Sequence, residues 1–167
     1  MTIAPPSYVL DADVFMAAAR GYYPLDLAPK FWKELVRFAS VGRLRSIDKI
    51  WDDIEKGQDD LTEWAAREFR QWFDSTNQDD VLGSYRQVMR WAEAQTQFTR
   101  AAKAEFAASS DGWLVAYAHA KRFVVATNET FEPAAKRKIK IPNACGAFSV
   151  RYVDTFDMIR ELPIVLT

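Results

Sequence analysis

The sequence predicts an α/β fold with a central, mainly parallel sheet. Short, strongly apolar segments typical of buried strands alternate with longer segments whose apolar residues recur at helical spacing. Such alternation indicates helices that cross between neighbouring strands and make those strands parallel. With 167 residues, 49% of them hydrophobic, the chain is expected to form one domain over residues 1–167.

Short apolar runs are the predicted strands. The first follows two prolines and runs directly into Asp11, and the third runs directly into Thr127. The predicted strands are residues 8–10, 44–47, 123–126 and 152–153. Residues 139–141 are expected to be a short strand or an extended piece, and residues 164–166 an edge segment.

Helices are predicted where apolar residues recur three or four positions apart. Asp26 is expected to cap the second helix, which ends at Gly42. Asp111, after two serines, is expected in the first turn of a later helix. The other predicted helices are residues 14–19, 48–57, 59–73, 79–93, a weaker one at 96–107, 142–148 and one near Phe156.

Acidic residues stand at the ends of predicted strands or near the starts of predicted helices. Asp11 and Asp13 follow the first strand, and Glu129 comes just past the third. Because the carboxyl ends of parallel strands form the ligand crevice, these three are expected on one rim. Asp111 is expected to converge on the same rim, with Asp53 nearby. Hard oxygen ligands suit Mg²⁺ or Mn²⁺, which can activate water and stabilise the leaving oxygen of a phosphodiester. Without metal, such crowding should raise at least one carboxyl pKa.

Most of these acids also have an ordinary structural role open to them. Asp111 is typical of a helix cap, Asp53 of a solvated helix face, and Asp13 can cap the helix that follows it. Asp11 differs, because an acid placed directly against a buried strand needs a partner. Spacing alone leaves a metal site and these structural roles as open alternatives.

Four segments of the sequence resemble the motifs of a known family. The first two are YVLDADVF at residues 8–15 and SIDKIWDDI at residues 46–54. The first resembles the opening strand of PIN domains, with Asp13 in the place of the usual Asn. The second resembles the next PIN motif, an acid within a helix after a short strand. Asp53 stands there where Glu is common.

The other two segments are DGWLVAYA at residues 111–118 and VVATNE at residues 124–129. They resemble the remaining PIN motifs, an Asp that opens a Leu- and Ala-rich helix and an apolar strand followed by Thr and an acid. Glu129 stands where Asp is more usual. All four motifs occur in order over most of the chain, and residues 22–24 and 138–145 further resemble a PIN-like subfamily whose role is poorly defined.

The resemblance implies a three-layer α/β/α sandwich and an endoribonuclease that cleaves single-stranded RNA with Mg²⁺ or Mn²⁺. The catalytic carboxylates would be Asp11, Asp53, Asp111 and Glu129, with the metal held by Asp11, Asp111 and Glu129. The supporting residues would be Asp13, Thr127 and Asn128. The resemblance also implies the toxin of a toxin–antitoxin pair, with an antitoxin protein as partner and a homodimer as assembly.

Basic residues near the predicted site are candidates for RNA binding, since an RNA backbone needs positive charge. They are Arg43, Arg45, Lys136, Arg137, Lys138 and Lys140. A solvated loop is an equally open interpretation of the run after residue 135. The net charge of −1 permits nucleic-acid binding only if the two signs of charge are segregated on the surface.

Several classes of protein are disfavoured by the composition. Cys145 is the only cysteine, so an intrachain disulfide and a cysteine-based zinc site are excluded, and this thiol is expected in the core. His119 is the only histidine and is expected to be a surface or half-buried helix residue. We expect a cytoplasmic protein without a leader or membrane segment, because no apolar run approaches membrane-spanning length.

Two alternatives to a ribonuclease remain. A haloacid-dehalogenase-like phosphatase also places Asp-x-Asp after its first strand, but it needs Thr or Val where Phe15 stands and a Gly before its late acidic motif, which Asp154 and Asp157 lack. The other alternative is a catalytically impaired PIN-like scaffold that binds RNA or a protein partner. The three departures from the PIN motifs and the near-neutral charge favour it.

Overall fold

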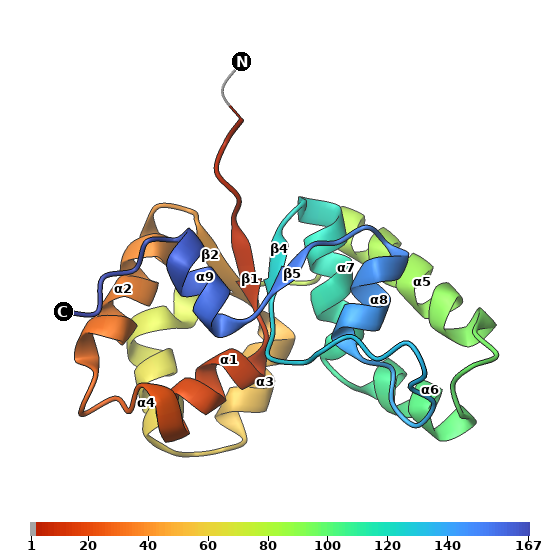
Figure 1. Cartoon of the computed structure of the whole chain (residues 1–167), viewed down its shortest axis with the longest axis horizontal. Coiled ribbons are helices and arrows are strands. Elements are labelled where there is room, and N and C mark those ends of the chain that lie inside the picture. The colour runs from red at the N-terminus through yellow and green to blue at the C-terminus, as the bar shows by residue number, and fades with distance from the viewer. Residues whose placement is uncertain (1–2) are drawn as a thin grey trace.

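The computed structural model describes residues 3–167, which form a parallel five-stranded sheet with helices on both sides (Figure 1). The strands are β1 (Tyr8–Leu10), β2 (Leu44–Ile47), β3 (Phe73–Asp74), β4 (Val124–Ala126) and β5 (Tyr152–Val153). Their order is β3-β2-β1-β4-β5, and every neighbouring pair is parallel. The predicted α/β fold with a parallel central sheet is confirmed.

The helices complete a three-layer arrangement. In Figure 1, α1, α2, α4 and α9 lie on one side of the strands and α5, α6, α7 and α8 on the other. The helices are α1 (Ala12–Ala17), α2 (Pro29–Ser40), α3 (Asp48–Glu55), α4 (Asp60–Trp64), α5 (Asp79–Ala94), α6 (Arg100–Ala108), α7 (Asp111–Lys121), α8 (Ile141–Ala147) and α9 (Thr155–Glu161). Within residues 3–167, no helix combines the length and the apolar character needed to cross a membrane.

The central strand β1 fixes where the polar residues at the end of the sheet lie. All three of its residues are buried, and Leu10 is level with Ala126 in β4. The Asp11 N–H continues this ladder by donating to the Ala126 carbonyl at 2.9 Å. The first residues after β1 and β4 are therefore neighbours at the carboxyl rim of the sheet.

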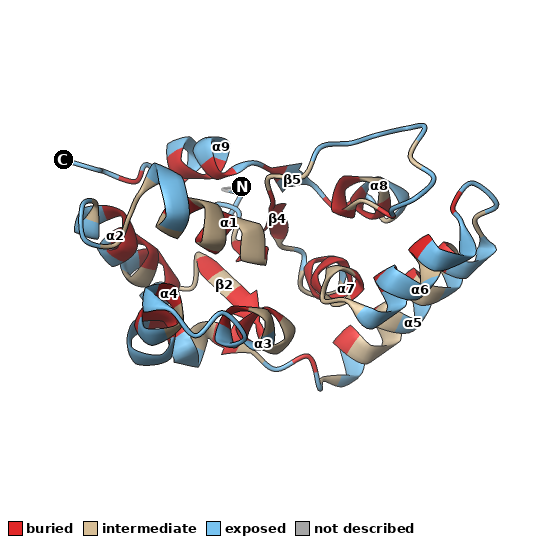
Figure 2. Cartoon of the chain, turned by 90° about the horizontal axis from the view of Figure 1, so that it is seen from below, coloured by how far each residue is buried: buried red, intermediate tan, exposed pale blue. Residues whose placement is uncertain are grey.

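Aromatic packing holds α1 against the sheet. Phe15 is fully buried and its ring contacts Phe69 at 5.5 Å and Phe73 at 5.9 Å between centroids. Figure 2 shows buried residues on the strands and on the inward sides of the helices. Such ring clusters add edge-to-face attraction to the hydrophobic effect, and this one anchors α1 one turn after Asp11.

The prediction of one helix over residues 59–73 is wrong in its second half. α4 ends at Trp64 and continues as a π-helical turn (Ala65–Phe69) and a 3₁₀ turn (Arg70–Trp72) before β3 begins. Phe73 then pairs with Ser46 of β2 as an edge strand. The spacing of Phe69, Trp72 and Phe73 is helical, but the three residues have different backbone conformations, with Phe69 and Phe73 buried in the core and Trp72 half-buried against it.

Two smaller expectations need correction, and a third holds in one of its two forms. Of the two forms expected for residues 139–141, the extended piece is present, since Lys140 has an extended backbone, but no strand forms and Ile141 begins α8. Residues 164–166 are irregular rather than an edge segment. Asp26 does not cap α2, since the cap position is Ala28 and Pro29 is the first helical residue. Cys145 is buried, as expected.

Candidate active site

Asp11 occupies the junction between β1 and α1. Its side chain is the N-cap of α1, accepting from the Ala12 N–H at 2.8 Å, and its other oxygen accepts from the Thr127 hydroxyl at 2.8 Å. Only 6% of the residue is exposed. The backbone register of β1 and β4 and two hydrogen bonds therefore fix this carboxyl group at the rim of the sheet.

Asp13 ties the first turn of α1 to the loop after β4. Its Oδ2 accepts from the Asn128 N–H at 3.0 Å and from the Thr127 hydroxyl at 3.5 Å. The Asn128 side chain in turn accepts from the Thr155 hydroxyl at 2.9 Å, at the start of α9. Thr127 and Asn128 thus support the two aspartates, and Asp13 Oδ1 remains buried without a hydrogen-bond partner.

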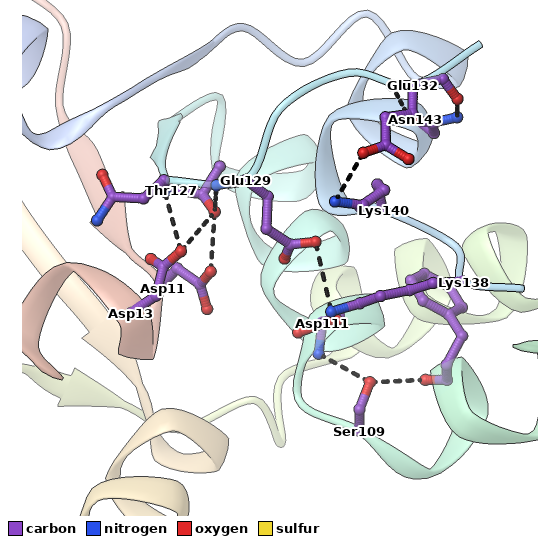
Figure 3. A network of polar contacts seen from close by, with 12 residues as sticks. Asp11, Asp13, Ser109, Asp111, Thr127, Glu129, Glu132, Lys138, Lys140 and Asn143 are labelled. Atoms are coloured by element: carbon purple, nitrogen blue, oxygen red, sulfur yellow. Dashed lines mark hydrogen bonds and ion pairs between the residues drawn. The ribbon is translucent and has the colours of Figure 1, made fainter. Parts of the chain in front are cut away.

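Glu129 and Asp111 approach the same space from the other half of the molecule. Glu129 follows β4, and its backbone N–H donates to the Thr127 hydroxyl at 3.2 Å. Asp111 is the first residue of α7. Figure 3 shows Asp11, Asp13, Glu129 and Asp111 around one space. The structure therefore brings these four carboxyl groups, which we call the acidic cluster, to the carboxyl rim of the sheet.

Asp53 lies beside the acidic cluster on α3. It accepts a hydrogen bond of 2.6 Å from the Ser110 hydroxyl, which directly precedes α7. A hollow of about 470 Å³ lies between α3 and the start of α7, and Asp53, Asp111, Lys49 and Trp113 are among the residues that line it. The sequence interpretation missed Ser110, because a serine before a helix normally indicates only a cap.

Burial and mutual repulsion shift the proton affinities of the cluster. The pKa of Asp11 is raised well above its usual value by burial and by the charges of Asp13 and Asp111. Burial and the Glu129 charge raise the pKa of Asp111 to about 7. Burial also raises the pKa values of Asp13 and Glu129. At least one carboxyl pKa is raised, as expected, but burial is the largest cause and repulsion between the carboxylates adds to it at Asp11 and Asp111.

The cluster fits a hard divalent cation in the chemistry of its donors. All of its donors are carboxylate oxygens, and both Asp13 Oδ1 and Glu129 Oε1 are buried without a hydrogen-bond partner. No three acidic, histidine or cysteine side chains within residues 3–167 are gathered closely enough to form a ready-made metal site. An ion held by Asp11, Asp111 and Glu129 would therefore have to draw these carboxylates together.

Of the basic residues predicted to bind RNA, those after residue 135 lie on one loop, and Lys138 on that loop reaches the acidic cluster. Lys138 places Nζ 3.7 Å from Glu129 Oε1, and Lys136 and Arg137 are exposed on the same loop. On that loop Lys140 pairs with Glu132 at 3.3 Å.

Arg43 and Arg45 are not brought to the acidic cluster. Arg43 precedes β2, so it lies at the amino rim of the sheet, where its Nε donates to the Pro6 carbonyl at 2.8 Å. Arg45 lies within β2, and its Nε is 3.8 Å from Asp74 of β3. The position of a residue relative to the direction of a strand decides which rim it reaches. Sequence proximity to the second strand therefore does not show which basic residues lie beside the acidic cluster.

Thr127→Val should lower the free energy of unfolding by about 2 kcal/mol, because a buried carboxyl oxygen of Asp11 would lose its hydroxyl donor. Thr127→Ser keeps the hydroxyl and should cost about 1 kcal/mol or less for the lost methyl group. Urea denaturation of the three proteins measures both effects. Equal stability of the valine variant and the wild type would show that Asp11 does not depend on this hydrogen bond.

A comparison of the sequence with known protein families finds a match, which spans both the sheet and the acidic cluster. The family described as "Domain of unknown function (DUF4411)" matches residues 8–166, a range that includes every carboxyl group of the acidic cluster. No curated protein matches the chain. Since the family match extends over nearly the whole sequence, the chain belongs to the DUF4411 family.

Proposed function

We propose that this protein is a PIN-like endoribonuclease that cleaves single-stranded RNA with the help of Mg²⁺ or Mn²⁺. The observation that carries the proposal is the acidic cluster itself. Four carboxyl groups from β1–α1, β4 and α7 share one rim of a parallel sheet, and all four have raised pKa values. Such electrostatic strain is common at functional sites and is relieved when a cation binds.

Each member of the site has a role that follows from its position. Asp11, Asp111 and Glu129 would hold the cation, and Asp53 lies at the edge of the site, where Ser110 fixes it. When bound, the ion would supply a Lewis acid for the scissile phosphate and its attacking water. Thr127 keeps the Asp11 carboxyl group oriented, because its hydroxyl is also held by the Glu129 N–H.

Two hollows beside the acidic cluster carry side chains that suit contacts with a single strand. The 470 Å³ hollow near Asp111 is lined in part by Lys49, Lys56 and Trp113. A second hollow of about 310 Å³ includes Glu129 and is bordered by Phe131 and Tyr152, which are 52% and 37% exposed. Exposed rings stack on unpaired bases while lysines attract the phosphate backbone. Both features favour single-stranded RNA as the substrate.

The impaired scaffold is the second candidate, and one observation favours it. The acidic residues within 3–167 are not assembled as a ready metal site, and three of them differ from the usual PIN residues. In this alternative the same surface binds RNA or a protein partner without cutting. An antitoxin partner and a homodimer, which the PIN resemblance implies, remain part of the proposal in either case.

The phosphatase alternative gains no support from the positions of its late acids. Asp154 is the N-cap of α9, where it accepts from the Asp157 N–H at 2.8 Å. Asp157 pairs with Arg160 at 3.2 Å. Both residues therefore have local structural partners at the start of α9.

The proposed function is tested by incubating the purified protein with end-labelled single-stranded RNA and with a matched duplex. Internal cleavage of the single strand is expected with Mg²⁺ or Mn²⁺ and none with EDTA. RNA that is bound but not cut with either metal would support the scaffold. Release of phosphate from a generic phosphomonoester, without RNA cleavage, would support the phosphatase instead.

A further inference from the structure

Lys138 brings a positive charge into the acidic cluster. Its Nζ lies 3.7 Å from Glu129 Oε1, and Figure 3 shows the side chain extending toward that carboxylate. Glu129 Oε1 is buried and has no hydrogen-bond partner. Although burial lowers the pKa of Lys138, the charges of Glu129, Asp111, Glu105 and Asp11 raise it overall. The ammonium group therefore lies in the field of several carboxylates rather than beside one surface acid.

The loop that carries Lys138 is anchored on both sides of it. Ile139 and Ile141 are 1% and 0% exposed, so the backbone beside the lysine is fixed to the core. Before it, the Lys136 carbonyl accepts from the Thr99 N–H at 2.9 Å, at the start of α6. A flexible, solvated loop would not hold a lysine in this way, so the approach of Lys138 to Glu129 is built into the fold.

We propose that the Lys138 ammonium group takes the place of a bound cation in the acidic cluster. In the metal-free protein this group neutralises Glu129, and a divalent cation binds in exchange for this contact. Lys138 is thus a positioning residue that sets the metal affinity of the site. This inference rests on the proposed function for the exchange with metal, but the contact between Lys138 and Glu129 stands without it.

Two physical effects determine whether Lys138 strengthens or weakens metal binding. An ion that takes Glu129 Oε1 must break the contact with Lys138, and two cations near the same carboxylates repel each other. The lysine side chain is 47% exposed and has a flexible four-carbon stem, so it can move aside into solvent. Both effects weaken metal binding, and removal of the lysine charge should therefore strengthen it.

The first experiment measures Mn²⁺ binding by isothermal titration calorimetry. Lys138→Met should bind Mn²⁺ about three- to tenfold more tightly than the wild type. Lys138→Arg keeps the charge and should stay close to the wild type. Lys136→Met is the matched control, because this exposed lysine lies on the same loop and forms no ion pair within residues 3–167. Unchanged or weaker Mn²⁺ binding by Lys138→Met would overturn the proposed exchange and leave Lys138 as an RNA contact.

The second experiment needs no metal and examines the contact itself by thermal unfolding in EDTA. Lys138→Met should lower Tm by about 2–4 °C at pH 7.5, whereas in a Glu129→Gln background the same change should have little further effect. An equal loss of Tm in both backgrounds would show that Lys138 does not stabilise the protein through Glu129. Wild-type protein that binds no Mn²⁺ would overturn both the exchange and the proposed metal site, and the EDTA comparison would still decide whether Lys138 neutralises Glu129.

Discussion

Asp11→Asn should lower the rate of metal-dependent cleavage of single-stranded RNA by about a thousandfold or more. Asp11 ends the central strand and is among the most firmly positioned of the cluster, with 6% of the residue exposed. Asparagine keeps the volume and one carbonyl oxygen but removes the charge that would attract the cation. Both cation affinity and stabilisation of the charged transition state should fall.

The variant should nevertheless fold. The retained oxygen of Asn can accept from the Ala12 N–H, as Asp11 Oδ1 does, and preserve the cap of α1. The amide nitrogen can donate to the Thr127 hydroxyl oxygen, which reverses the present hydrogen bond without leaving a buried group unpaired. Because burial already disfavours the charged form of Asp11, thermal stability in EDTA should hold or rise.

Asp26→Asn is the matched control for this substitution. Asp26 is exposed in the turn before α2, so its loss of charge should leave both cleavage and stability unchanged. Initial rates with Mn²⁺, measured for both variants at saturating RNA, make the comparison. Cleavage by Asp11→Asn at the wild-type rate would refute the mechanism, while an unfolded variant would show that the Asp11 charge is needed for folding.

The positions of Asp11, Thr127 and Glu129 were predictable because each depends on one local rule. Asp11 and Thr127 directly follow buried strands and Glu129 comes two residues after Thr127, and parallel strands bring their carboxyl ends to the same rim. Asp111 was predictable for a similar reason, as the residue that opens a helix crossing back to the sheet. To predict these positions, only the direction of the strands has to be known, and this direction follows from the alternation of strands and helices.

Features that depend on packing between distant segments could not be predicted in this way. The pairing of Phe73 with Ser46 makes β3 an edge strand although its own spacing is helical. The contact of Lys138 with Glu129 depends on how the buried Ile139 anchors an irregular loop. Arg43 is near the second strand in sequence but lies at the amino rim, away from the acidic cluster.

The pH dependence of stability in EDTA should reverse the usual acid-denaturation trend. The pKa of Asp111 is about 7 in the folded protein, against an ordinary value of 3.8 that should hold in the unfolded chain. Between these values the folded state holds a proton that the unfolded state has lost, so stability must fall as pH rises. The contribution of Asp111 is therefore fully present below about pH 4 and lost by about pH 7 to 8. Asp11, Asp13 and Glu129 are shifted in the same direction and should steepen the slope.

Asp111→Asn should remove much of this slope and make the metal-free protein more stable than the wild type at pH 8, by up to about 4 kcal/mol. The neutral amide resembles the protonated acid that the folded site favours. Loss of the Asp111 charge also lowers the repulsion on Asp11 and Glu129. Urea denaturation at pH 5, 6, 7 and 8 in EDTA measures the effect, with Asp26→Asn as the control. Saturating Mn²⁺ should flatten the wild-type slope as well, because the cation offsets the same repulsion. A wild-type protein that gains stability from pH 5 to pH 8 in EDTA would show that burial and repulsion do not raise the pKa values of these four carboxyl groups in the folded protein.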